Sequence, residues 1–243
     1  MSQPSPRVVV LMGAYNEEQY LDETILAVLH QTMPDFGLLL FNNGSTDDTA
    51  DMMTAYGLRD ERVTFLSVPT NLPPSRAMNL GVATAHARWP DCEWFVSHGA
   101  DDVMEPDYLE ALLDAAQGNA CNYVFSPWQW IDHPEKGVKR FPDYDPDTIH
   151  AVHQTPAWGA IHRSLWELVG GHHAEDGIGS DWGFFVRASA KQILRPKQLD
   201  RPYISLRVRE NGRVTQSEEI HWPAMHRHLC GLAGKPVPSW AKC

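Results

Sequence analysis

Apolar runs and helical periods alternate through the first half of the chain. Arg7–Met12 (RVVVLM) is a β-branched apolar run typical of a buried strand, and Glu18–Gln31 then repeats apolar residues at helical spacing. Four strand–helix units in succession predict a mostly parallel sheet with right-handed crossovers. The further units are expected strands at Phe36–Phe41, Val63–Val68 and Trp94–Ser97, and expected helices at Thr46–Tyr56 (capped by Ser45 or Thr46), Pro74–Ala87 and Pro106–Gln117.

This alternation ends after Gly118. Ile131–Pro156 is rich in Pro, Asp and His and has no period, which predicts a loop. The 243 residues of the chain suit one α/β domain rather than two. Around the loop we expect a strand at Tyr123–Trp130, helices at His162–Val169 and Asp181–Ala190 separated by the Gly-rich Gly170–Ser180, a late strand at Ile204–Val208, and no clear period from Trp222 onward.

The composition excludes several classes of protein. With 43% hydrophobic and 21% charged residues, the chain is not of the disordered class. It has no apolar stretch near the roughly 18–20 residues that cross a bilayer. Met1–Pro6 lacks the basic and apolar regions of a secretory signal, so we expect a cytoplasmic protein. The cysteines have no CxxC or paired spacing, which favours reduced thiols over a zinc cluster or disulfides: Cys92, Cys121, Cys230 and Cys243.

Charge is distributed unevenly along the chain. Residues 1–120 hold 5 Lys and Arg against 18 Asp and Glu, whereas residues 121–243 hold 15 against 13. The net charge of −11 argues against nucleic acid as a partner, because gripping a phosphate backbone requires a basic stripe. The run from Arg187 to Arg213 nevertheless holds eight basic residues against Asp200 and Glu210. It is either a solvated basic face or a surface that neutralises a diphosphate or touches anionic lipid.

Polar side chains follow three of the predicted strands. They lie in Gly13–Glu17, Asn42–Asp47 and Ser97–Asp102, and the carboxyl ends of parallel strands meet at one edge of a sheet, where ligands bind. The adjacent carboxylates of Asp101 and Asp102 repel each other unless a cation or hydrogen-bond donors hold them. They therefore predict a Mg²⁺ or Mn²⁺ site, with the alternative that Asp102 caps the next helix and Asp101 is solvated.

These segments, in this order, resemble family 2 glycosyltransferases, a large inverting family with the GT-A fold. The resemblance to the nucleotide-sugar-binding half lies in VVVLMGAYNEEQYLDETILAVLHQT, LLLFNNGSTDDTADMM and WFVSHGADDVMEPDYLEALL. GAIHRSLWELVGG followed by GSDWGFFVRA resembles the acceptor-side segment that carries the catalytic base. The resemblance covers roughly residues 7–190. It implies a single GT-A domain, Rossmann-like with a mostly parallel sheet, with a nucleotide-sugar half at about 7–118, an acceptor half at about 119–215 and a tail at 216–243.

The resemblance implies transfer of a sugar from a nucleoside diphosphate to a hydroxyl of a glycan or glycoconjugate acceptor. Asn42 stands where the family commonly has Asp, and its amide suits the N–H and C=O of uracil, which favours UDP. Tyr15 either contacts the base or packs half-buried beneath its loop, and Arg76 either reaches the ribose or phosphate or lies on the surface. The residues implied for the nucleotide are Ala14, Tyr15, Glu17, Asn42, Arg76, Asp101 and Arg209.

Asp101 and Asp102 resemble the family's DXD-type motif and are the implied ligands of Mg²⁺ or Mn²⁺. The chain departs from the common form D-x-D-D because Gly99 occupies the first acidic position. Arg209 lies near the place where the family often has a histidine. An arginine does not bind the metal, but it can neutralise a phosphate directly.

Asp181 is the implied catalytic base. A carboxylate on the acceptor side, opposite the departing diphosphate, can accept the hydroxyl proton, and the same residue could also cap the following helix. Trp158 and Trp182 flank this region and are the candidate acceptor-binding residues, because sugar rings present C–H faces that pack on aromatic planes. Trp128 and Trp130 receive no role.

Two other functions remain open from the sequence. Gly99 and Arg209 fit a non-catalytic glycan- or nucleotide-binding module that kept the scaffold. Nucleotidyl transfer would need a Gly-rich basic loop after the first strand, and GAYNEE is acidic. Contact with a membrane surface and the oligomeric state are also left open. The remaining histidines fit surface or loop positions better than a metal cluster: His172, His173, His221, His226 and His228.

Overall fold

A seven-stranded sheet forms the centre of the molecule in the computed structural model, which describes residues 5–208 and 222–237. The strand order is β3-β2-β1-β4-β8-β6-β9. β1 to β4 run parallel, and β8 runs antiparallel to both of its neighbours, β4 and β6. The mostly parallel sheet is thus confirmed, with one antiparallel strand inside it. The strands are β1 (Val8–Ala14), β2 (Phe36–Asn43), β3 (Val63–Val68), β4 (Trp94–Gly99), β6 (Tyr123–Phe125), β8 (Gly159–His162) and β9 (Pro196–Gln198).

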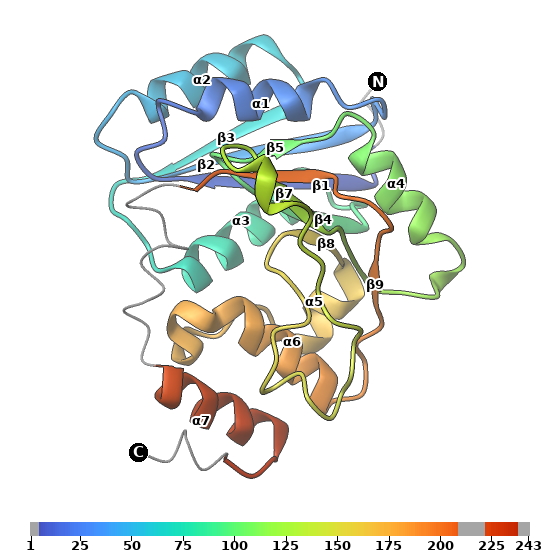
Figure 1. Cartoon of the computed structure of the whole chain (residues 1–243). Helices are drawn as coiled ribbons and strands as arrows, with labels where there is room; N and C mark the ends of the chain where they lie inside the picture. The colour runs from blue at the N-terminus through green and yellow to red at the C-terminus, as the bar shows by residue number, and fades with distance from the viewer. Residues whose placement is uncertain (1–4, 209–221, 238–243) are drawn as a thin grey trace.

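Helices cover both faces of this sheet (Figure 1). Alternate residues of β1 enter the two cores, Val8 and Val10 on one face and Val9 and Leu11 on the other, which explains the unbroken apolar run. The first core packs α1 (Leu21–Leu29), α2 (Thr49–Arg59) and α4 (Tyr108–Ala115), and the second packs α3 (Pro74–Arg88), α5 (Arg163–Val169) and α6 (Ser180–Ala190). Short 3₁₀ helices lie at Gln117–Asn119, Pro134–Lys136 and Ala174–Gly179.

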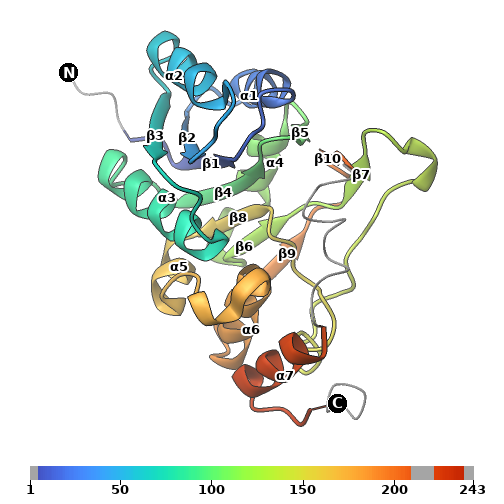
Figure 2. The same ribbon diagram turned by 90° about the vertical axis from the view of Figure 1, so that its left-hand side faces the viewer.

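A second, three-stranded sheet lies beside the first (Figure 2). It consists of β5 (Val103–Met104), β10 (Ile204–Leu206) and β7 (Trp128–Trp130), in the order β5-β10-β7. The prediction of one strand over Tyr123–Trp130 is wrong, because the chain leaves the large sheet at Ser126 and joins the small one at Trp128. Pro127 lies at the crossing, and a proline has no N–H to continue the ladder.

The loops after β1 and β2 are tied to each other. The Asn16 N–H donates to Ser45 Oγ (3.0 Å), and Asn16 Oδ1 accepts the N–H of Thr46 (2.8 Å). Helix α2 therefore begins at Thr49, after Asp48, and the prediction that Ser45 or Thr46 caps it is wrong. Gly44 makes the turn between them possible, since its φ is +80° and a Cβ there would lie 2.6 Å from the Thr70 backbone.

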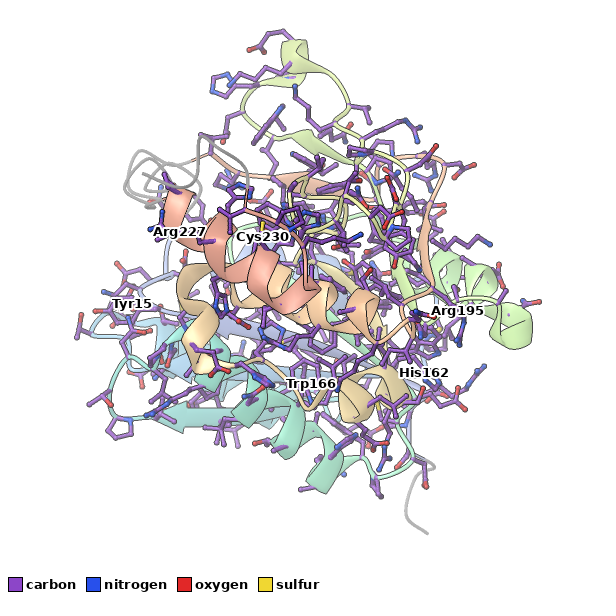
Figure 3. The ribbon with its side chains drawn as sticks, turned by 90° about the horizontal axis from the view of Figure 1, so that it is seen from below. Tyr15, His162, Trp166, Arg195, Arg227 and Cys230 are labelled. Carbon is purple, nitrogen blue, oxygen red and sulfur yellow. The ribbon has the colours of Figure 1, made fainter. Side chains whose placement is uncertain are left out.

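Helix α7 (Trp222–Ala233) packs against α6 (Figure 3). The expectation of no regular structure from Trp222 is wrong. Leu229 and Cys230 of this helix are buried together with His226, and a histidine within the apolar stripe hides the helical period. No helix in the described ranges is long and apolar enough to cross a membrane.

The cysteines in the described part of the chain are free and buried. Burial raises the pKa of the Cys92 thiol to about 12, so this side chain stays protonated at neutral pH. The predicted reduced thiols are confirmed for Cys92, Cys121 and Cys230, while Cys243 lies outside the described residues.

Candidate active site

Three strand-end segments meet at one edge of the large sheet. In the parallel ladders Ala14 lies opposite Asn42, and Gly13 lies opposite Gly99. The ends of β1, β2 and β4 are therefore side by side, as predicted for the polar residues that follow them. This edge is where an open α/β sheet binds its ligand.

The predicted nucleotide-contacting residues differ in how free their side chains are. Tyr15 is 40% exposed and lies at the rim of the molecule (Figure 3), so its ring is accessible rather than half-buried beneath the loop. Asn42 is buried, its amide N–H donates to Ser67 Oγ (2.8 Å) and its Oδ1 accepts the Ser45 N–H (3.0 Å). It therefore offers a ligand one further N–H and one further lone pair.

Two other predicted residues lie at helix starts. The N–H of Glu17 donates to Thr49 Oγ1 (2.8 Å) at the beginning of α2, which fixes the backbone of the first loop. Arg76 is exposed in the first turn of α3, within the helix predicted from Pro74. Arg209 lies outside the described residues.

Asp101 and Asp102 are half-buried in the turn that joins β4 to β5. Asp102 Oδ1 accepts the backbone N–H of Arg207 (3.1 Å), while its Oδ2 lies over Gly99 so closely that a Cβ there would clash with it. Helix α4 begins at Tyr108 after Asp107, so the alternative in which Asp102 caps this helix is wrong. Beneath the turn lies the buried His98, whose pKa is lowered to about 4 by burial and which stays neutral at pH 7.

The donor set of this turn suits a hard divalent cation. Two adjacent carboxylates are oxygen ligands of the kind that Mg²⁺ and Mn²⁺ take. Among the described residues, no three His, Cys, Asp or Glu side chains converge as a complete metal site. A cation held by Asp101 and Asp102 would therefore complete its coordination with substrate phosphate oxygens and water.

Introducing the missing acid at position 99 is expected to weaken this site. Gly99→Asp should raise the Mn²⁺ concentration needed for nucleotide binding by roughly tenfold or more, because its Cβ displaces the Asp102 carboxylate. Calorimetric titration of UDP at several Mn²⁺ concentrations measures the effect. Gly57→Ala is the control, since a Cβ there meets Phe65 at an ordinary 3.5 Å. Tighter Mn²⁺ binding by Gly99→Asp would contradict this account of the turn.

Asp181 lies half-buried in the first turn of α6. The helix starts at Ser180 after Gly179, so Asp181 is not its N-cap and that alternative is wrong. Its charge acts on several neighbours, among them Tyr123 and His172. Burial raises the pKa of Tyr123 and the Asp181 carboxylate adds to this, whereas burial lowers the pKa of His172 to about 4 and Asp181 partly opposes it. Both neighbours are thus neutral at pH 7.

The two candidate acceptor-side tryptophans have different environments. Trp158 is half-buried just before β8, where Gly159 pairs with Ser97 of β4, so it lies beside the donor edge. Trp182 is buried, and its indole N–H donates to the Ile149 carbonyl (2.6 Å). Its ring centroid lies 5.1 Å from that of His153 and 5.3 Å from that of His226, and only 6% of the residue is exposed. The prediction that Trp182 contacts the acceptor therefore does not fit its packing.

Sequence reasoning missed Arg207. It lies next to Asp101 and Asp102. The arginine predicted from the sequence to reach the diphosphate is instead Arg209, two residues later. The only signal was its membership of the basic run from Arg187 to Arg213. The sequence of that run does not distinguish one arginine from another. The pairing of β10 with β5 in the structure is what brings Arg207 to the acidic turn.

A family model for glycosyl transferase family 2 matches residues 9–186, from β1 to within α6. The chain belongs to this family. The match includes the strand-end loops, the Asp101–Asp102 turn and Asp181. A relative from Haemophilus influenzae, described as an uncharacterized glycosyltransferase, is 30% identical over 114 residues, 47% of this chain and 34% of the relative. The chain spans about a third to a half of the length of three curated relatives that it matches.

Solved structures confirm the GT-A fold expected of a family 2 member. S. aureus TarS (residues 1–349), in complex with UDP-GlcNAc, superposes with a TM-score of 0.74 at 17% identity. The alignment covers 93% of this chain and 66% of that one. The mannosyltransferase PcManGT from Pyrobaculum calidifontis, in complex with GDP-Man and Mn²⁺, gives a TM-score of 0.66 at 17% identity, over 96% of this chain and 66% of that one.

Proposed function

We propose that this protein transfers a sugar from a nucleoside diphosphate sugar, with UDP favoured, to an acceptor hydroxyl, with inversion at the anomeric carbon. The observation that carries the proposal is the pairing of β4 with β8. It brings the Asp101–Asp102 turn and Trp158 to one edge of the sheet. Tyr123 then connects this edge to α6, since its hydroxyl donates to the Pro156 carbonyl with the Trp158 carbonyl 3.3 Å away, and its ring packs on Phe185 (4.3 Å).

The donor nucleotide would occupy the edge formed by β1, β2 and β4. Tyr15 offers an accessible ring for the base, and Asn42 offers the second N–H and lone pair of an amide that is already held in place. An amide with one donor and one acceptor matches the N–H and C=O of uracil. Membership of family 2 and the UDP-GlcNAc complex of TarS support this assignment.

Asp181 would act as the general base. Its carboxylate accepts the proton of the acceptor hydroxyl while that oxygen forms the new bond to the anomeric carbon, and the bond to the diphosphate breaks on the opposite face. The Trp158 ring, half-buried next to the donor edge, is the aromatic surface on which an acceptor sugar would pack.

Asp101 and Asp102 would hold Mg²⁺ or Mn²⁺. A cation bound there supplies charge that stabilises the departing diphosphate. The Mn²⁺ in the PcManGT complex supports the choice of a divalent cation. The Asp102 carboxylate is already oriented, because its Oδ1 accepts the Arg207 N–H.

A thermal-shift screen of UDP, GDP, CDP and dTDP, with and without Mn²⁺, tests the proposal. UDP with Mn²⁺ at a hundred times its Kd should add about 2.7 kcal/mol of stability and raise the melting temperature by roughly 5–10 °C. UDP without Mn²⁺ should give a smaller rise. A larger rise with another nucleotide would correct the donor class. No rise with any of the four would favour the non-catalytic module, for which Gly99 is the structural argument.

A further inference from the structure

Arg207 lies directly after β10 and contacts both members of the acidic pair. Its backbone N–H donates to Asp102 Oδ1 (3.1 Å), and its Nε–H donates to the Asp101 carbonyl (3.2 Å). Its side chain is only 13% exposed. Arg207 therefore contacts the acidic turn twice, with its backbone at the Asp102 carboxylate and with its side chain at the Asp101 main-chain carbonyl.

The register of the small sheet explains how Arg207 reaches the turn. In the antiparallel pair of β10 and β5, Ile204 lies opposite Met104 and Ser205 lies opposite Val103. Continued by two residues, this register brings Arg207 opposite Asp101. Strand β5 has only two residues and is too short to pair with the backbone N–H of Arg207. The Asp102 carboxylate accepts this N–H instead.

The guanidinium group of Arg207 also contacts residues at the start of α1 and in the loop after β7. Nη2 donates to Glu23 Oε2 (2.7 Å), and Nη1 lies 3.7 Å from Asp132 Oδ1. The guanidinium carbon lies 4.5 Å from the centre of the Tyr20 ring. A planar group with five donors can bond the Asp101 carbonyl and these carboxylates at once, which a lysine cannot do.

We propose that Arg207 is a positioning residue that sets the Asp101 and Asp102 carboxylates for a divalent cation and the donor diphosphate. This inference rests on the proposed function. An arginine that only stabilised the fold would change melting temperature alone. A positioning role adds a specific effect on cation-dependent nucleotide binding, with no effect on binding in the absence of the cation.

The test compares Arg207→Met with a matched control on the other side of β10. Arg201 likewise donates to a carboxylate, Asp107 (2.7 Å), and its guanidinium carbon lies 3.9 Å from the Tyr203 ring, but it does not touch the acidic turn. UDP binding is measured by calorimetry over a series of Mn²⁺ concentrations and in EDTA. Arg207→Met should raise the half-saturating Mn²⁺ concentration by about 10- to 100-fold and leave UDP affinity in EDTA unchanged. Arg201→Met should change neither.

A second variant covers the case in which Arg207→Met does not fold. Glu23→Gln combined with Asp132→Asn keeps Arg207 and removes its two carboxylate partners, and it should also raise the half-saturating Mn²⁺ concentration. The same Mn²⁺ dependence in these variants as in Arg201→Met would overturn the role of Arg207. Wild-type UDP binding that does not depend on Mn²⁺ would also overturn the role of Arg207. Wild-type protein that binds neither UDP nor GDP under any condition would overturn the proposed function itself, and this inference with it.

Discussion

Replacing Asp181 by Asn is expected to slow sugar transfer by about 10²- to 10⁴-fold, the contribution typical of a positioned general base. The amide keeps the shape of the side chain in the first turn of α6 and cannot accept the hydroxyl proton. UDP release from UDP-glucose and UDP-N-acetylglucosamine, with water as the acceptor, measures the rate. The thermal shift given by UDP should not change, because the role proposed for Asp181 is toward the acceptor hydroxyl and not toward the nucleotide.

Glu175→Gln provides the control for this variant. Glu175 is an exposed carboxylate six residues before Asp181, and it accepts a hydrogen bond from His173 Nδ1 (3.1 Å). Its loss should leave the rate unchanged. A fully active Asp181→Asn enzyme would refute the assignment of the base, and an Asp181→Asn variant that no longer binds UDP would show that Asp181 supports the donor site instead.

Replacing Asp176 by Asn is expected to lower the free energy of unfolding by about 3–5 kcal/mol, the cost typical of removing one partner of a buried ion pair. The Asp176 carboxylate is completely buried, and it accepts bonds from both terminal nitrogens of Arg187 on α6. It also accepts a bond from His228 Nε2 on α7 (2.7 Å). Gly183 makes room for it, since a Cβ there would lie 2.5 Å from the carboxylate. Denaturation in urea at pH 7 measures the loss.

The effect of Asp176→Asn should depend on pH. Burial alone would raise the pKa of Asp176, but the bonds from Arg187 and His228 outweigh it and lower the pKa below the ordinary 3.8. The stabilisation is therefore present above about pH 4 and is lost as the pH falls through the lowered pKa. The wild type and Asp176→Asn should converge in stability below pH 4.

Asp147→Asn is the comparison for this pair. Asp147 binds Lys235 Nζ at 2.6 Å, but its side chain is 79% exposed, so its loss should cost less than about 1 kcal/mol. Equal losses in Asp147→Asn and Asp176→Asn would contradict the buried cluster as the link between α6 and α7. The expectation of surface or loop positions is wrong for His226, which is buried on α7, whereas His228 lies on the same helix and is partly exposed.

Local patterns predicted the repeating units and the edge on which the site lies. The apolar run at Val8–Met12 predicts a strand covered on both faces, and that single fact forces helices onto each side. Parallel order then brings Ala14, Asn42 and Gly99 together, because all three strands end at the same edge. These conclusions require only the period of the side chains and the rules of chain connection.

The parts that the sequence did not predict depend on pairing between distant segments. β5 has two residues, too short for any period, and it exists because it pairs with β10, the strand that the sequence predicted at Ile204–Val208. Trp182 and Trp158 look alike in the sequence, and only their packing separates a core indole from one beside the donor edge.

The sequence by itself determined the α/β fold, membership of its family, and the positions of Asp101, Asp102 and Asp181 at loop and helix starts. The tertiary structure decided that Arg207, among the described residues of the basic run, meets the acidic turn, and how α7 is held to α6. The physical reason is one of range. Hydrophobic period and turn chemistry act between neighbours in the chain, whereas Arg207 with Asp102 and His228 with Asp176 meet only after folding brings residues 105 and 52 positions apart into contact.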